Sequence, residues 1–116
     1  MLVYFDKNSI LEKQVVAFDV RLTNDVNNLA TNGQVVFGTV DLNDGNGYNP
    51  SNGLFSAPAS GVYVFDWTTM TQKGKTVYTS LVVNGKKKSW NYCNDTASKT
   101  FRTCSKMTVV KLKQGD

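Results

Sequence analysis

The chain of 116 residues carries a formal net charge of +4, and 41% of its residues are apolar. This length and apolar content predict one folded domain with its own core and exclude a disordered chain. The small positive excess is typical of a solvated surface and does not indicate a nucleic-acid-binding protein. No apolar run reaches the roughly 18 residues that a membrane-spanning helix needs.

Residues 1–14 are interpreted as an N-terminal extension, and the folded domain is expected over residues 15–116. Asp6 and Lys7 interrupt the apolar stretch that a signal peptide requires, so any export signal is expected outside this chain. Residues 16–22 then alternate in polarity, with Phe18 among the apolar members, which predicts a half-buried strand. Residues 23–33 have the composition of a loop.

The middle of the chain predicts two longer strands with a short one between them. Residues 34–42 form the first, and residues 61–69 form a strand that is apolar on both sides, as in a core. Between them, Pro50 and Pro58 restrict the backbone and mark turns on either side of a short strand at Phe55.

The last third of the chain predicts a hairpin and a further strand. Residues 77–83 alternate in polarity, Asn84-Gly85 supplies a strong hairpin signal, and residues 86–93 form the return strand. Residues 107–113 are predicted as a strand that leads into a turn at Gly115. Because no helical periodicity persists, the sequence predicts an all-β fold.

Cys93 and Cys104 are the only cysteines, and they flank a polar loop between two predicted strands. This placement favours a disulfide, worth about 3 kcal/mol by the loop-entropy estimate, although two free buried thiols would also fit the sequence. The sequence Asn94-Asp95-Thr96 within the loop is a glycosylation acceptor. Together these features favour an oxidising, extracellular setting.

Catalytic and metal-binding patterns are missing from the sequence. The chain has no His, so neither a Ser-His-Asp nor a Cys-His arrangement can form, and a zinc site lacks ligands. An EF-hand loop counted from Asp41 would place Asn46 and Asn52 where Gly and Glu are required. We therefore expect no enzyme activity, no cofactor and no metal.

The candidate ligand-binding residues lie on the return strand of the hairpin. They are Lys86, Lys87, Lys88, Trp90 and Tyr92, with alternation placing Lys86, Lys88, Trp90 and Tyr92 on one face. Lysines beside exposed aromatic rings can bind anionic glycans, because the ammonium pairs with an acidic group while the ring stacks on a sugar. The alternative is a hairpin tip solubilised by lysines, with Trp90 buried in the core.

Eight spaced positions in the middle of the chain resemble the complement C1q globular-head family. They are Phe37, Asn43, Tyr48, Phe55, Gly61, Tyr63, Phe65 and Trp67, the last standing where the family has Phe or Tyr. Residues 16–22, 81–85 and 107–116 also resemble family strands, so the resemblance covers residues 16–116. The cysteine pair and the stretch VNGKKKSWNYC resemble C1q-domain proteins of bivalve molluscs most.

This resemblance implies a jelly-roll β-sandwich that assembles as a homotrimer. It further implies a secreted recognition module of innate immunity that binds microbial surface glycans or lipopolysaccharide, without nucleic acid binding or membrane insertion. The alternative is a structural or signalling extracellular trimer, such as a matrix component or a ligand similar to tumour necrosis factor. Family members that bind calcium use carboxylates in a region that reads SKTFRTCSK here and has none.

The family pattern continues for two strands after its Gly-Asp turn, whereas this chain ends at Asp116. The resemblance therefore implies a domain truncated at its C-terminus. We expect an unpaired edge beside the strand at residues 16–22 and, as a consequence, a protein that is insoluble or loosely packed.

Overall fold

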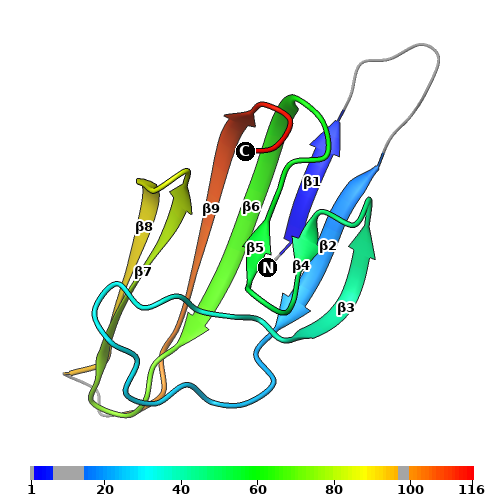
Figure 1. Cartoon of the computed structure of the whole chain (residues 1–116). Helices are drawn as coiled ribbons and strands as arrows, with labels where there is room; N and C mark the ends of the chain where they lie inside the picture. The colour runs from blue at the N-terminus through cyan, green and yellow to red at the C-terminus, as the bar shows by residue number, and fades with distance from the viewer. Residues whose placement is uncertain (1, 7–14, 97–99) are drawn as a thin grey trace. The chain divides into compact units, whose positions relative to one another are not determined.

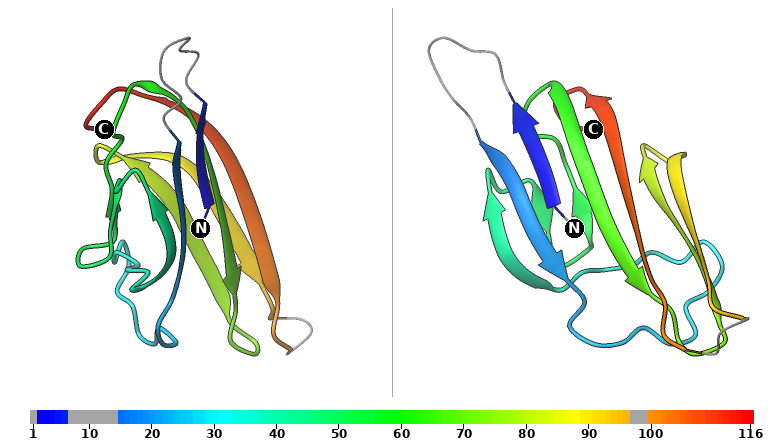
Figure 2. Two further views of the ribbon diagram at one scale, coloured as in Figure 1. Left: turned by 90° about the vertical axis from the view of Figure 1, so that its right-hand side faces the viewer. Right: turned by 180° about the vertical axis from the view of Figure 1, so that it is seen from behind.

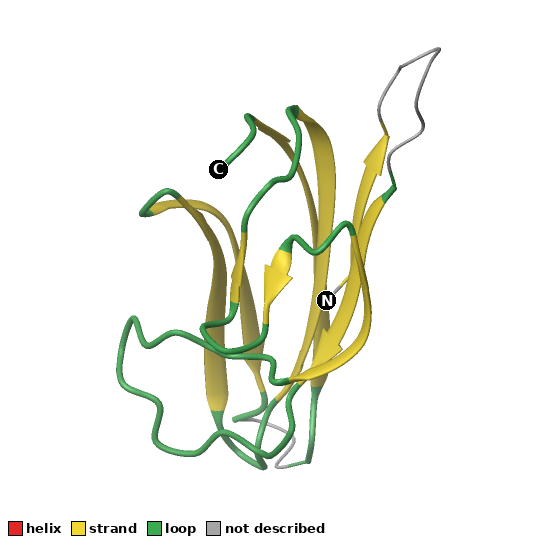
Figure 3. Ribbon diagram, turned by 45° about the vertical axis from the view of Figure 1, so that its right-hand side comes forward, coloured by secondary structure: helices red, strands yellow, loops and turns green. Residues whose placement is uncertain are grey.

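The computed structural model describes residues 2–6, 15–96 and 100–116, and within them it contains strands and no helix (Figure 3). The all-β prediction is confirmed. The strands, labelled in Figure 1, are β1 (Leu2–Asp6), β2 (Val16–Arg21), β3 (Thr39–Asp44), β4 (Tyr48–Asn49), β5 (Leu54–Phe55), β6 (Gly61–Met70), β7 (Thr76–Val83), β8 (Lys86–Asn94) and β9 (Thr103–Leu112).

These strands form one five-stranded sheet in the order β3-β2-β1-β6-β9 and two hairpin sheets, β4-β5 and β7-β8. The chain divides into two compact units, one of Met1–Phe65 with Val109–Asp116 and the other of Asp66–Thr108. Strands β6 and β9 run through both units. The candidate ligand-binding residues of the sequence all lie in the second unit.

The first unit has a core of stacked aromatic rings. The Phe18 ring of β2 lies 5.0 Å from the Tyr48 ring and 5.1 Å from the Phe55 ring, measured between centroids. Phe55 in turn meets Tyr63 and Phe65 of β6 edge to face, at 5.6 and 5.7 Å. Such arrangements are favourable because the positive ring edge meets the negative face.

Hydrogen bonds between motif residues explain much of the spacing noted in the sequence. The Asn43 side chain donates to the Tyr48 carbonyl at 2.8 Å and accepts from the Tyr48 N–H at 3.2 Å. The Tyr48 hydroxyl donates to the Phe37 carbonyl at 2.7 Å, and the Tyr63 hydroxyl donates to the Ala59 carbonyl at 2.7 Å. Burial raises the pKa of Tyr48 and of Tyr63, and the hydrogen bond to each carbonyl partly opposes the effect. These hydrogen bonds give the motif residues a structural role in the first unit.

The C-terminal turn is bonded to the segment that precedes β6. The Ala57 N–H donates to the Asp116 carbonyl at 2.7 Å, and the Gly115 N–H donates to the Ala57 carbonyl at 2.9 Å. Gly115 has a φ of 90°, which favours glycine because it lacks a Cβ. The predicted turn is thus an integral part of the first unit.

The second unit is organised around Trp67 of β6 and the β7–β8 hairpin. Trp67 is 5% exposed, and its indole N–H donates to the Thr79 hydroxyl at 2.8 Å. The hairpin turns through Asn84 and Gly85, whose φ values of 49° and 78° confirm the predicted tight turn.

Three sequence expectations differ from the structure. The strand predicted over residues 34–42 begins only at Thr39. The Phe37 carbonyl accepts a hydrogen bond from the Tyr48 hydroxyl, and the Gln34 side-chain amide donates to the Asn52 carbonyl. These groups bond to loop and turn residues instead of to a neighbouring strand. Tyr48 and Asn49, for which no strand was predicted, form the short strand β4. The last strand starts at Thr103 rather than at residue 107.

The expected unpaired edge beside residues 16–22 is also wrong. Strand β2 pairs antiparallel with β3 on one side and with β1 on the other, so both of its edges are bonded (Figures 1 and 2). Residues 2–6, interpreted from the sequence as part of an extension, form strand β1. Residues 7–14 of that extension lie outside the described residues, and the domain boundary stays a prediction.

Candidate functional site

The β7–β8 hairpin separates a buried face from an exposed aromatic face. In its register Tyr78 lies opposite Tyr92, and Ser80 lies opposite Trp90. Directly opposed residues of an antiparallel pair point to the same side of the sheet. Tyr78, Trp90 and Tyr92 are 74%, 67% and 49% exposed. We refer to these three residues as the aromatic face.

The exposure of Trp90 contradicts one part of the alternative interpretation of the hairpin. The alternative reading placed Trp90 in the core, but the buried tryptophan of this unit is Trp67. Cys93 and Thr79 occupy the opposite side of the hairpin, since side chains alternate along each strand. Trp90 is therefore available to a ligand within this unit.

Tyr78 and Tyr92 form a stacked pair on the aromatic face. Their ring centroids are 4.4 Å apart with an interplanar angle of 27°. Tyr78 is largely exposed, but partial desolvation raises its pKa. The charge of Tyr92 and a hydrogen bond with Tyr92 raise the pKa of Tyr78 further. The Tyr78 phenol is thus available as a neutral hydrogen-bonding group at physiological pH.

A β-bulge redistributes the three lysines at the start of β8. The pairing shifts between Leu81 and Val82, so that Leu81 opposes Ser89 while Val82 opposes Lys87. One extra residue on a strand reverses the alternation beyond it. Lys87 therefore shares the side of the aromatic face, whereas Lys86, opposite Val83, points to the other side. The expectation that Lys86 lies on the face of Trp90 and Tyr92 is wrong for this reason.

A hollow of about 320 Å³ lies beside Trp90. Its lining consists of Lys88, Ser89 and Trp90 from β8 and Lys106 from β9. Lys106 was not among the residues predicted from the sequence, because nothing in the sequence shows which strand lies near β8. The position of Lys106, two residues after Cys104, is a signal that could have found it, since alternate residues of a strand point to the same side.

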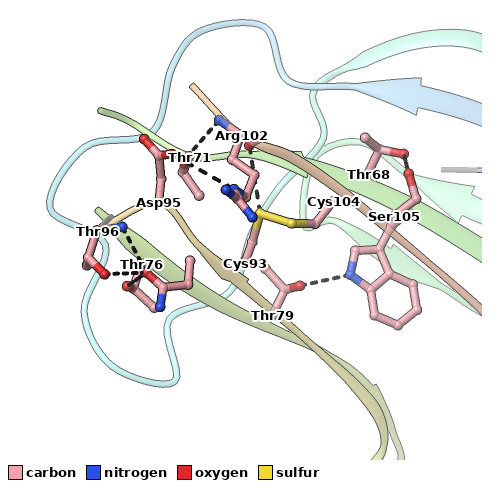
Figure 4. The surroundings of a disulfide bond; sticks show 12 residues. Thr68, Thr71, Thr76, Thr79, Cys93, Asp95, Thr96, Arg102, Cys104 and Ser105 are labelled. Atoms are coloured by element: carbon pink, nitrogen blue, oxygen red, sulfur yellow. Dashed lines mark hydrogen bonds and ion pairs between the residues drawn. A yellow bond between two sulfur atoms is a disulfide. The ribbon is translucent and has the colours of Figure 1, made fainter. Parts of the chain in front are cut away.

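The predicted disulfide is present and joins β8 to β9 (Figure 4). The Cα atoms of Cys93 and Cys104 are 5.8 Å apart, and Cys93 is fully buried. Beside the disulfide, the buried Asp95 carboxylate accepts the Gly74 N–H at 3.2 Å and lies 3.9 Å from the Arg102 guanidinium. Arg102 and Thr71 are also hydrogen-bonded through their backbones at 2.8 Å. These contacts fix both ends of the cysteine loop, of which residues 97–99 lie outside the described part.

Asn94, the predicted glycosylation residue, lies at the end of β8 with its side chain in a local turn. Its carboxamide oxygen accepts the backbone N–H and the hydroxyl of Thr96, both at 2.8 Å, and the Thr76 hydroxyl at 3.2 Å. The acceptor asparagine and its threonine are thus in direct contact. Glycosylation of Asn94 stays a prediction.

Within residues 2–6, 15–96 and 100–116, no cluster of three or more His, Cys, Asp or Glu side chains could hold a metal ion. The same described residues contain no helix of a length and apolarity that could cross a membrane. The β7–β8 hairpin and the hollow beside it present aromatic rings, lysines and hydroxyl groups.

Comparison with known proteins gives one family. A sequence model of the C1q domain matches residues 17–116. The chain is 36% identical over 86 residues to complement C1q tumor necrosis factor-related protein 3 of Mus musculus and 35% identical over 86 residues to the protein of that name of Homo sapiens. Each alignment covers 73% of this chain and 35% of the relative, so the chain spans about a third of the length of these relatives.

Proposed function

The chain belongs to the C1q domain family, and from this premise we propose that it is an extracellular recognition module of innate immunity. In this proposal it binds microbial surface glycans or lipopolysaccharide as a trimeric head. The observation that carries the proposal is the aromatic face of the β7–β8 hairpin, with lysines beside it. Exposed, stacked rings on a strand pair form a preorganised surface, which reduces the entropy lost on binding.

The aromatic face has the chemistry that sugars require. The apolar C–H side of a pyranose ring can stack on Trp90 or on the Tyr78–Tyr92 pair, while the tyrosine hydroxyls supply hydrogen bonds. Lys87 and Lys88 are exposed and lie beside these rings. Their ammonium groups can pair with phosphate or carboxylate groups, which are common on microbial polysaccharides.

Trimer formation is supported by exposed apolar side chains on the strands of the second unit. Met70 of β6 and Met107 of β9 are 65% and 63% exposed. The hydroxyls of Thr68 on β6 and Ser105 on β9 are hydrogen-bonded at 2.8 Å, so the two strands lie side by side here. Each of these residues precedes its methionine by two positions and shares its side of the strand. Methionine is enriched at protein interfaces, and this surface is a suitable position for a second copy of the chain.

An extracellular location is supported by the disulfide, because such bonds persist in oxidising compartments and are rare in the cytosol. The glycosylation acceptor at Asn94 would be used in the same setting. The absence of His from the chain and the family membership support a role in recognition without catalysis.

A glycan array combined with a bacterial pull-down tests the proposal. We expect saturable binding by the wild-type chain that is lost in Tyr78→Ala/Trp90→Ala and weakened in Lys87→Ala/Lys88→Ala. Lys113→Ala is the matched control, because Lys113 is exposed and belongs to the other unit. Binding that survives the aromatic double variant, in protein whose melting temperature is unchanged, would contradict the proposal.

A second function, that of a structural or signalling trimer, is favoured by the names of the relatives, which refer to tumor necrosis factor. It predicts capture by a cell-surface receptor or matrix protein and no glycan binding. Incubation of the labelled chain with cells stripped of surface glycans separates the two functions. Undiminished binding to stripped cells supports the signalling function, whereas loss of binding supports glycan recognition.

A further inference from the structure

We propose that the hollow beside Trp90 is a subsite for an acidic group carried on a sugar, and that Lys106 is one of the two cations that bind this group. The acidic group is a sulfate, carboxylate or phosphate. This inference rests on the proposed glycan recognition and adds to it a ligand class and a residue, Lys106, that the sequence did not indicate.

The disulfide accounts for the position of Lys106. Cys104 of β9 is bonded to Cys93 of β8, so the side chains of β9 on that side face β8. Lys106 follows Cys104 by two residues and therefore points to the same side. Lys106 is only partly exposed, unlike its neighbours Ser105 and Met107, which point away. A covalent bond within the second unit thus holds the two strands that bear the cations.

The β-bulge accounts for the position of Lys88. Lys87 pairs with Val82 and Ser89 pairs with Leu81, and these two partners are adjacent on β7. Lys88, between Lys87 and Ser89, is therefore the additional residue of the bulge. Strand residues in a bulge are displaced from regular alternation. Ser89 and Trp90 keep regular alternation opposite Leu81 and Ser80. The consecutive residues Lys88, Ser89 and Trp90 therefore line the hollow along the edge of β8 that faces away from β7.

The charges in the hollow favour an anion. The ion pair of Asp41 is with Arg21, and Asp95 lies beside Arg102. Neither Lys88 nor Lys106 has a carboxylate within 4.0 Å in the described part of the chain. Two ammonium groups that share one hollow repel each other until an anion lies between them. Sulfate, carboxylate and phosphate groups present the oxygens that such a pair of cations binds.

The size and the lining of the hollow favour an acidic sugar over a free ion. Its volume of about 320 Å³ is at the lower end of small-molecule sites, which run from about 300 to 1,000 Å³. A free sulfate or phosphate would leave most of this space empty. A sugar ring can fill this space beside Ser89 and Trp90 and carry its acidic substituent between Lys88 and Lys106, with the Ser89 hydroxyl available as a further hydrogen-bonding group.

The test measures the affinity of the wild-type chain and its variants for matched acidic and neutral ligands. One pair is a heparin-derived octasaccharide and its desulfated, N-acetylated counterpart, and the other is lipopolysaccharide before and after enzymatic dephosphorylation. For Lys106→Gln we expect the affinity for the acidic member of at least one pair to fall about tenfold, as loss of a charge-assisted contact implies. The affinity for the neutral members should stay constant, and Lys106→Arg should retain most of the binding.

Lys111→Gln is the matched control. It removes the same charge as Lys106→Gln, and Lys111 is an exposed residue of the same strand, β9. We expect its effect on affinity to stay below about twofold, as is usual for a distant surface charge. The pair of ligands that responds to Lys106→Gln identifies the source of the acidic group. Equal losses for Lys106→Gln and Lys111→Gln would overturn the subsite, as would equal affinity for the acidic and neutral members of both pairs.

Trp90→Ala separates failure of the subsite from failure of the proposed function. In one outcome, Trp90→Ala abolishes binding of acidic and neutral ligands alike while Lys106→Gln spares both. This result would support glycan binding by the aromatic face and overturn the acidic subsite. If the wild-type chain binds none of the four ligands and no other glycan on an array, glycan recognition itself is overturned, and the subsite with it.

Discussion

Trp67 and Trp90 belong to the same unit, but the first is buried and the second is exposed. Truncation of a buried tryptophan costs about 3–5 kcal/mol, because contacts are lost and a cavity remains. Trp67→Ala would in addition leave the Thr79 hydroxyl without its indole partner. We expect Trp67→Ala to lower the free energy of unfolding by this amount, and Trp90→Ala to change it by less than about 0.5 kcal/mol.

Urea denaturation followed by circular dichroism measures both changes. Trp67→Phe serves as a control, because it keeps an aromatic ring of the type that the family carries at this position and loses only part of the packing. A large loss of stability in Trp90→Ala would mean that its side chain is buried in the folded protein, and would contradict the placement of the aromatic face.

The buried tyrosines give the stability a dependence on pH in the alkaline range. Burial raises the pKa of Tyr48 and Tyr63 above the value of 10.0 that an unfolded tyrosine has. The stability that each neutral phenol contributes is therefore fully present below about pH 10 and is lost as the pH rises through the folded-state pKa. Thermal melting should show a steep fall of the melting temperature above this pH.

The double variant Tyr48→Phe/Tyr63→Phe isolates this effect from lysine deprotonation. At neutral pH it should be less stable than the wild type, since each lost hydrogen bond costs about 1 kcal/mol. Above about pH 10 the two proteins should converge, because the variant has no phenol to ionise at these positions. Parallel melting curves across the whole pH range would show that neither phenol is desolvated in the fold.

At the scale of elements, strands with strong local signals were predictable and those defined by distant contacts were not. The β7–β8 hairpin was predicted because Asn84 and Gly85 determine its turn locally, and β6 because its apolar residues are contiguous. Residues 34–38 carry the same β-branched and aromatic composition as a strand. Their polar groups, however, bond to Tyr48 and Asn52, which no local pattern shows.

The disulfide links β8 to β9 and should contribute strongly to the stability of the second unit. It closes a loop with a sequence separation of 11 residues, for which the loop-entropy estimate is about 3 kcal/mol. We expect reduction, or the variant Cys93→Ala/Cys104→Ala, to lower the free energy of unfolding by this amount. The buried Asp95 beside it should become easier to hydrate, because the cysteine loop is then free to open.

Urea denaturation with and without reductant measures this contribution, and non-reducing mass spectrometry verifies the bond in the purified protein. The double variant should not respond to reductant. If the wild-type protein is equally stable under both conditions, the packing of β8 and β9 is independent of the covalent bond. The position of Lys106 would then need another explanation.

At the scale of the whole molecule, the resemblance to a family was more informative than periodicity. The aromatic spacing from Phe37 to Trp67 indicated the family, and the hydrogen bonds among Phe37, Asn43 and Tyr48 show why such spacing is needed. The pairing of β1 with β2 could not be predicted, because a short N-terminal run carries no signal for its partner. The hollow at Lys106 could not be predicted either, since it depends on the proximity of β8 and β9.

The last prediction concerns assembly. The sequence suggested an insoluble or loosely packed chain because one edge of the strand at residues 16–22 was expected to be unpaired, but β2 has a partner on each side. We therefore expect a folded protein that associates as a homotrimer through the exposed apolar surface around Met70 and Met107. Its melting temperature should rise with protein concentration, because association stabilises only the folded state.

Sedimentation equilibrium of the wild-type chain and of Met107→Glu tests this prediction. A carboxylate at a buried contact that is repeated in each subunit carries a desolvation penalty at every interface, so the variant should be monomeric and less stable. Val26→Glu is the matched control, since Val26 is an exposed apolar residue of the loop before β3, and we expect it to remain trimeric. A monomeric wild-type protein would contradict the trimer. A trimer that persists in Met107→Glu would place the interface elsewhere, on the exposed apolar residues outside β6 and β9.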